Sequence, residues 1–258
     1  GWSIGQLPDD KEFYKAAIAA TTGRLVAFDP KTGKVAWSKD YPAAWNGGTM
    51  TTAGNLVFQG TSTGLFKAYS ADKGKELLSM EMQSGIVSAP STYMIDGEQY
   101  VAFLTSKGGA FPLVAGVAGG VTRQLPNIPR LVVMKLGGKV KLPALPEKGE
   151  VVWDPPVQTG TPEQIAAGKA LFGRNCLVCH GDSAIGNGFT PDLRVSGVLP
   201  DTDAWASVVT GGALKHAGMV SFGKQLSATQ VENIRHYVVN RSNWTKANLP
   251  EMTAPTQR

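Results

Sequence analysis

The residues with the clearest chemistry are Cys176, Cys179 and His180, which stand together in the stretch Cys-Leu-Val-Cys-His. Two thiols about one helical turn apart can each add to a vinyl group on the same edge of a porphyrin. The imidazole of the next residue then reaches under the ring and places a nitrogen on the iron. The C-x-x-C-H pattern therefore predicts a covalently attached haem c, with His180 as one axial ligand of the iron.

Two other interpretations of a C-x-x-C pair fit this sequence less well. A zinc site would need further Cys or His ligands at partner spacing, and the chain has only these two cysteines. A thioredoxin-like dithiol would follow a strand within a βαβ pattern, which this region of the sequence lacks. Because both cysteines belong to one motif, the chain also offers no framework of structural disulfides.

The second axial ligand of the iron is expected to be Met219, which precedes the last predicted helix. A thioether on a turn that crosses the open face of the ring favours ferrous iron and raises the reduction potential. His216, three residues earlier, stays open as the alternative ligand. His236 lies within a predicted helix and is interpreted as a surface or packing histidine.

Three helices are predicted around these ligands. Residues 161–164, Thr-Pro-Glu-Gln, form a capping box and begin a helix that leads into Cys176. Residues 227–230, Ser-Ala-Thr-Gln, form a second capping box, and a shorter helix is expected at about 203–210. The positions predicted to face the core are Ile165, Gly168, Leu171, Phe172, Trp205, Val208, Val209, Val231, Ile234, Tyr237 and Val238.

The first half of the chain repeats itself. Residues 23–37 align with residues 64–78 at an offset of 41, and each copy reads as strand, hairpin turn and strand. Further short strands are predicted at 55–60 and 98–103. A period near 41 residues with about four short strands per copy is typical of β-propeller blades, and an unrelated β-meander is the alternative.

Composition narrows the functional classes. Apolar residues make up 42% of the chain and charged residues 17%, which argues against global disorder. No run of 18 apolar residues exists, so no membrane span is predicted. The net charge of +5 comes without a dense Lys/Arg cluster, which argues against a nucleic-acid partner. The chain begins Gly-Trp-Ser, so we expect that any signal peptide has been removed or that the true start lies upstream.

Residues 161–240 resemble a class I cytochrome c over the whole segment. In that family a proline carbonyl accepts the proximal imidazole N–H, and an arginine often contacts a haem propionate. The stretch Pro-Asp-Leu-Arg at 191–194 is similar to the loop that carries them. The resemblance implies that Pro191 orients His180 and that Arg194 binds a propionate.

The β half resembles a second family. The pattern Ala-x-Asp-x-x-x-Gly-x-x-x-Trp at 27–37 is similar to the tryptophan-docking motif of quinoprotein dehydrogenases, although the second copy has Ser70 and Leu78 in place of Asp and Trp. Residues 44–61 and 84–90 resemble the closing blades of type II quinohaemoprotein alcohol dehydrogenases. In that family an eight-bladed propeller binds pyrroloquinoline quinone (PQQ) and Ca²⁺, and a cytochrome c follows a Pro-rich linker.

This resemblance covers about 23–240 and implies an all-β propeller portion of about two blades followed by an all-α cytochrome c domain. The expected boundaries are 1–138 for the C-terminal blades, 139–160 for the Pro-rich linker, 161–245 for the cytochrome and 246–258 for a tail. Two blades cannot close a ring, so the missing blades would come from the same chain or from another one. The family's catalytic aspartate, Ca²⁺ ligands and vicinal disulfide would lie upstream.

The resemblance also implies an activity, namely periplasmic, PQQ-dependent oxidation of an alcohol, with electrons passed through haem c to an external acceptor such as a small redox protein or a quinone. Trp45 would contact the quinone, and residues 108–113 would cover the substrate funnel, beside a Lys107 where the family often has Trp. The alternative is a non-catalytic c-type electron carrier whose β-scaffold docks a partner.

Overall fold

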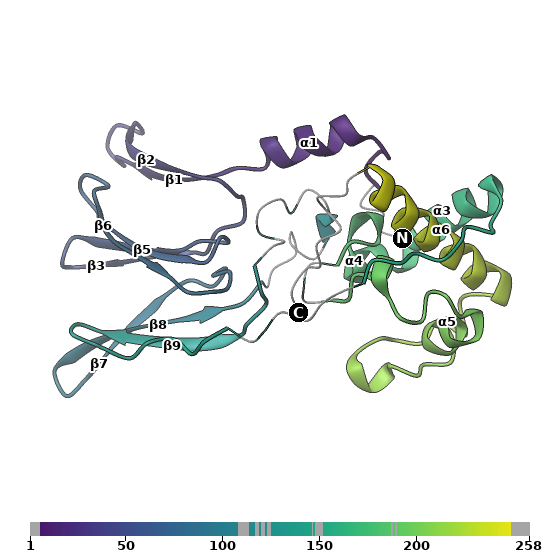
Figure 1. The fold of residues 1–258 in the computed structure, drawn as a ribbon. Helices are drawn as coiled ribbons and strands as arrows, with labels where there is room; N and C mark the ends of the chain where they lie inside the picture. The colour runs from purple at the N-terminus through teal and green to yellow at the C-terminus, as the bar shows by residue number, and fades with distance from the viewer. Residues whose placement is uncertain are drawn as a thin grey trace. The chain divides into compact units, whose positions relative to one another are not determined.

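The computed structural model describes residues 6–107, 114–116, 119, 122, 125–145, 147, 152–186, 188 and 190–248. These residues divide into two compact units, whose elements are labelled in Figure 1. The helical unit comprises the described residues within 1–14, 113–117 and 149–255, and the sheet unit comprises those within 15–112 and 118–148. Residues 6–14 and 114–116 therefore belong with the helices, although the sequence had grouped them with the blades.

The sheet unit consists of three antiparallel sheets in chain order. In Figure 1 the four-stranded sheet lies between the other two. The first sheet pairs β1 (Gly23–Phe28) with β2 (Val35–Tyr41). The second contains β3 (Thr49–Thr52), β4 (Leu56–Gly60), β5 (Leu65–Ser70) and β6 (Glu76–Glu81). The third contains β7 (Ser91–Ile95), β8 (Glu98–Thr105) and β9 (Arg130–Lys135).

The 41-residue repeat is confirmed at the level of single hydrogen bonds. Strands β1 and β2 correspond to β5 and β6, and each pair has a register shift at the same place, after Ala27 in one and after Ala68 in the other. In the first hairpin Gly33 N–H donates to the Asp29 carbonyl at 2.8 Å, and the equivalent bond in the second has the same length. The glycine of each turn has a positive φ, of 67° and 63°, which explains why both copies keep it.

The tryptophan-docking contact joins the two copies. The indole nitrogen of Trp37 donates to the Ala71 carbonyl at 2.8 Å. A Cβ atom at Gly74 would stand 2.6 Å from the indole ring, so the turn glycine is needed for this close approach. The first copy therefore packs its tryptophan on the turn of the second copy.

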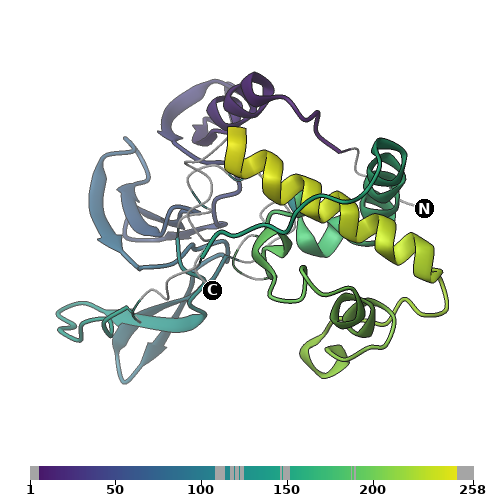
Figure 2. The same cartoon turned by 45° about the vertical axis from the view of Figure 1, so that its right-hand side comes forward.

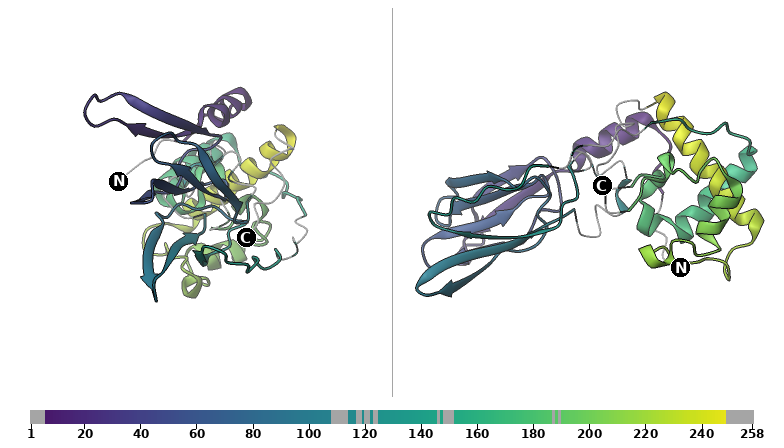
Figure 3. Two further views of the ribbon diagram at one scale, coloured as in Figure 1. Left: turned by 90° about the vertical axis from the view of Figure 1, so that its left-hand side faces the viewer. Right: turned by 60° about the horizontal axis from the view of Figure 1, so that its bottom comes forward.

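The helical unit is built on two long helices. Helix α3 (Pro162–Asn175) packs against α6 (Ala228–Asn248), and Figure 2 and the right-hand view of Figure 3 show the long α6 running across this unit. Helix α5 (Thr202–Val209) packs on α6 as well. The remaining elements are α1 (Lys11–Ala20), which spans both units, α4 (Leu177–His180), and the 3₁₀ turns η2 (Asp182–Ala184), η3 (Leu193–Val195) and η4 (Lys215–Ala217). No helix among the described residues is long and apolar enough to cross a membrane.

Both predicted capping boxes are present. Thr161 accepts from the Gln164 backbone at 3.3 Å while Gln164 accepts from the Thr161 backbone at 2.8 Å, and Ser227 and Gln230 repeat the arrangement. Helix α6 continues to Asn248, beyond the boundary expected at 245. The core between the helices contains Phe172, Leu177, Leu199, Trp205, Val209, Val231, Ile234, Tyr237 and Val238.

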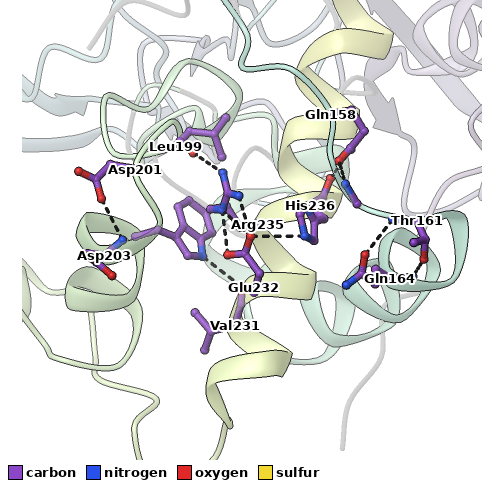
Figure 4. A network of polar contacts seen from close by, with 12 residues as sticks. Gln158, Thr161, Gln164, Leu199, Asp201, Asp203, Val231, Glu232, Arg235 and His236 are labelled. Carbon is purple, nitrogen blue, oxygen red and sulfur yellow. Dashed lines mark hydrogen bonds and ion pairs between the residues drawn. The ribbon is translucent and has the colours of Figure 1, made fainter.

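The C-terminal end of the Pro-rich segment is bound to the helical unit (Figure 4). Gln158 donates to the backbone carbonyl of His236 at 2.8 Å. Asn243 of α6 also donates to the Pro156 carbonyl at 2.8 Å. A Cβ atom at Gly160 would stand 2.7 Å from Cβ of His236, so the chain passes close to α6 here. Residues 156–160 are consequently part of the helical unit.

Candidate haem-attachment site

Helices α3 and α4 place both cysteines on one helical turn. Cys176 ends α3, and its amide donates to the Phe172 carbonyl at 2.8 Å. The amides of Cys179 and His180 donate to the Cys176 carbonyl at 3.1 Å and 2.9 Å. Both thiols are free, with Cys176 half-buried and Cys179 exposed. Burial, and secondarily Cys179, raise the pKa of the Cys176 thiol to about 12. Two unpaired thiols one turn apart, beside a histidine, suit attachment to one porphyrin edge.

The His180 ring is buried, and one of its nitrogens contacts the loop that contains Pro191. Its Nδ1 lies 3.4 Å from the Pro191 carbonyl oxygen, as the resemblance to the class I cytochromes c implied for Pro191. A carbonyl oxygen only accepts, so this contact favours the tautomer with the proton on Nδ1, which leaves the lone pair of Nε2 available for a metal. Burial lowers the pKa of His180, outweighing the opposing effects of the Pro191 contact and of Asp192. The neutral imidazole, which is the form that binds iron, is therefore favoured.

Arg194 is fully buried on the loop that follows Pro191. Its Nε and Nη2 donate to the Asp192 carboxylate at 2.9 Å and 2.6 Å, its Nη1 donates to Thr245 at 3.3 Å, and the Trp153 ring lies 4.8 Å away. These hydrogen bonds use three of the five N–H groups of a guanidinium. Its contact with a haem propionate stays a prediction.

The candidates for the second axial ligand lie in different surroundings. Met219 is half-buried and follows η4 and Gly218, whose φ of 93° turns the chain. His216 is exposed within η4. His236 is buried on α6, where its Nε2 lies 3.3 Å from Glu232, so it is a packing histidine. No group of three or more His, Cys, Asp or Glu side chains that could hold a metal ion occurs among the described residues.

The sheet unit holds the residues expected near the quinone. Trp45 is half-exposed with a φ of 62°. The next residue, Asn46, accepts from the Ser62 backbone at 2.9 Å and donates to the Ala43 carbonyl at 2.9 Å, so it braces the turn that presents Trp45. Lys107 is buried, and its backbone donates to Asn127 at 3.0 Å. The whole segment predicted to cover the substrate funnel, residues 108–113, lies outside the described residues.

Sequence reasoning missed Asp182 and Ser183, which directly follow the motif. Both side chains are buried, and besides bonding to each other they have partners outside the predicted cytochrome segment: Asp182 accepts from the Leu7 amide, and the Ser183 hydroxyl contacts that of Tyr14. The polar pair Asp-Ser after Gly181 was a visible signal, but nothing local in the sequence revealed its partners.

Two family models match the chain. Residues 163–238 match "Cytochrome C oxidase, cbb3-type, subunit III", and residues 42–101 match "Glucose/ethanol/alcohol dehydrogenase, beta-propeller domain". The first match covers the C-x-x-C-H helix and the loop with Pro191, and the second covers the four-stranded sheet β3–β6. Each unit of the structure thus matches its own family.

Relatives and solved structures contain both units in the same order. Quinohemoprotein alcohol dehydrogenase ADH IIB of Pseudomonas putida is 47% identical over 86% of this chain and 32% of its own length. The dehydrogenase subunit of alcohol dehydrogenase (quinone) of Acetobacter aceti is 37% identical over 95% of this chain and 34% of its own. The solved structure of quinohemoprotein alcohol dehydrogenase ADHIIG from Pseudomonas putida HK5 superposes with a TM-score of 0.89, at 33% identity, over 97% of this chain and 36% of that one.

The chain spans about a third of the length of these relatives. Its strand-rich part and its cytochrome part both align with them, and the solved structure shares the fold of nearly the whole chain. The chain is accordingly a homologue of the quinohaemoprotein alcohol dehydrogenases and corresponds to the C-terminal part of such an enzyme.

Proposed function

We propose that this chain supplies the haem relay and part of the propeller of a periplasmic, PQQ-dependent alcohol dehydrogenase. The observation that carries the proposal is the haem-attachment helix, in which two free thiols and a buried, neutral imidazole lie on one turn. This helix occurs in one chain with a sheet unit that matches the propeller of the same enzymes.

The residues of the chain have distinct tasks on this proposal. Cys176 and Cys179 hold the porphyrin, the Pro191 carbonyl fixes the His180 ring, and Met219 is the second axial ligand. Leu193, Val198 and Phe222, half-buried at the edge of the helical core, would exclude water from the ring. When bound, the haem supplies one-electron transfer and PQQ accepts electrons two at a time from the alcohol, which is why a single-electron relay is needed. Arg194 would use its remaining N–H groups for a propionate.

The sheet unit is proposed to be the closing portion of an eight-bladed propeller. The sheet β3–β6 has the four antiparallel strands of one blade, and β1–β2 and β7–β9 would belong to its neighbours. Trp45, presented by the turn that Asn46 braces, would contact the PQQ ring. The Ca²⁺ ligands and the catalytic base would lie in the part of the enzyme that precedes this chain, and an external electron acceptor would reoxidise the haem.

A chimaera tests this function directly. The chain, matured with haem, is joined to the upstream two thirds of ADH IIB, and PQQ, Ca²⁺ and ethanol are added while the ferrous haem band is followed. We expect reduction by ethanol, and no haem band in the matched variant that lacks Cys176 and Cys179. If ethanol is oxidised with an artificial acceptor while the haem stays ferric, the haem does not relay electrons from the quinone. The chain would then be the alternative, a c-type electron carrier whose β-scaffold docks a partner.

A further inference from the structure

A short stretch upstream of the sheets packs on the helical unit. Residues 6–14 lead into and begin α1. Tyr14, at 0% exposure, stacks edge-on against Trp244 of α6 at 5.7 Å. Gln6 reaches the Tyr237 hydroxyl at 3.4 Å. The segment therefore completes the core of the unit that carries the C-x-x-C-H helix.

The same segment contacts the loop that directly follows His180. The Leu7 amide donates to the Asp182 carboxylate at 3.1 Å, and the Tyr14 hydroxyl lies 3.0 Å from the Ser183 hydroxyl. Ser183 and Ala184 have φ values of 58° and 62°, which L-residues rarely adopt. Such a conformation persists only where surrounding contacts hold it.

Arg241 is a buried arginine beside this segment, and a buried positive charge needs a negatively charged partner. Arg241 of α6 is 1% exposed, and its guanidinium nitrogens make no hydrogen bond of good geometry with any residue in the described part of the chain. Its nearest carboxylate is that of Asp9, 2.8 Å from Nη1, and the Trp244 ring lies at 4.4 Å. The buried Asp182 carboxylate is a second negative charge within electrostatic reach of Arg241. Asp9 also pairs with Lys169 of α3 at 3.1 Å. A buried charge that loses its partner is strongly destabilised, so Arg241 holds Asp9 in position.

We propose that residues 6–14 are a lock on the haem-attachment loop. The Asp9–Arg241 ion pair fixes the segment in place, and Leu7 and Tyr14 then hold Asp182 and Ser183, which directly follow the axial histidine in the chain. The inference rests on the proposed function, because the loop matters only where His180 binds iron. Asp9, Tyr14 and Arg241 are then positioning residues, since they act on the haem through the loop and not by touching it.

The test uses the full haem-loaded chain and amide hydrogen exchange at residues 183–185. Asp9→Asn and Arg241→Met remove one charge each, whereas Arg241→Lys keeps the charge. Asp40→Asn breaks the exposed Arg24–Asp40 pair of the sheet unit and is the matched control. We expect exchange at 183–185 to rise at least tenfold in the two charge-removing variants, and to stay within twofold of wild type in Arg241→Lys and Asp40→Asn.

A second readout reports on the haem itself. A looser loop admits water beside the ring and favours ferric iron. At the ambient potential where half of the wild-type haem is reduced, we expect clearly less than half to be reduced in Asp9→Asn and an unchanged fraction in Asp40→Asn. Haem attached normally, with exchange and reduced fraction as in wild type in both Asp9→Asn and Arg241→Met, overturns the lock. Absence of haem from the wild-type chain would overturn the proposed function instead.

Discussion

Replacing Gly168 by alanine tests the closest approach between α3 and α6. A Cβ atom at this position would lie 2.6 Å from the carbonyl carbon of Asn233 and closer still to its oxygen. Both atoms belong to the backbone of α6, so they cannot move aside as a side chain would. The two helices must separate, and separation opens the core around Phe172 and Tyr237, whose rings lie 5.2 Å apart.

The expected cost follows from two opposing effects. Overpacking costs about 1–3 kcal/mol, and a rigid backbone neighbour places Gly168→Ala near 3 kcal/mol. Alanine is about 1 kcal/mol better than glycine within a helix. The net loss of about 2 kcal/mol corresponds to a fall in Tm of roughly 8–16 °C for a domain of this size. Thermal unfolding followed by circular dichroism and by the Soret band measures it for the helical unit.

The matched control is Gly173→Ala on the same helix. The atoms nearest to a Cβ there belong to the side chain of Gln6, at 3.1 Å, and that side chain can rotate away. The helix preference of alanine should then dominate, so we expect Tm to stay equal or to rise by a few degrees. Equal Tm values for Gly168→Ala and Gly173→Ala would refute the argument that backbone contact at Gly168 sets the α3–α6 distance.

Three further predictions concern other parts of the chain. Trp37→Phe removes the hydrogen bond to Ala71 and should lower the unfolding free energy of the sheet unit by about 1 kcal/mol, measured by urea denaturation; an unchanged midpoint would show that this contact is not needed. Burial, and then the hydrogen bond with Tyr41, raise the pKa of Tyr69 well above its usual value. The contribution of Tyr69 to folding stability is therefore complete below about pH 10. It declines above that pH, because the tyrosine of the unfolded chain ionises there while the folded one stays protonated. Tyr69→Phe should flatten the fall in stability between pH 9 and 11, and an unaltered slope would contradict this cause. Met219→Ala should leave the haem covalently attached but change its visible spectrum and lower its potential, and an unchanged spectrum would point to His216 as the ligand.

Local patterns in the sequence determined most of the chemistry. The C-x-x-C-H stretch, the capping boxes at Thr161 and Ser227, and the hairpin turns at Gly33 and Gly74 each involve residues within about five positions of one another. Their hydrogen bonds form within a single turn, so residue type and spacing specify them without knowledge of the fold. The 41-residue repeat was also readable, because both copies satisfy the same local rules.

Tertiary structure alone decided what surrounds that chemistry. Asp9 and Arg241 are 232 residues apart, and Tyr14 and Ser183 are 169 apart, yet both pairs meet beside the haem-attachment loop. Nothing near Asp9 in the sequence distinguishes it from a surface aspartate. Its role follows from the burial of Arg241, and burial is a property of the packed unit, in which a charge out of water must find an opposite charge wherever in the chain it lies.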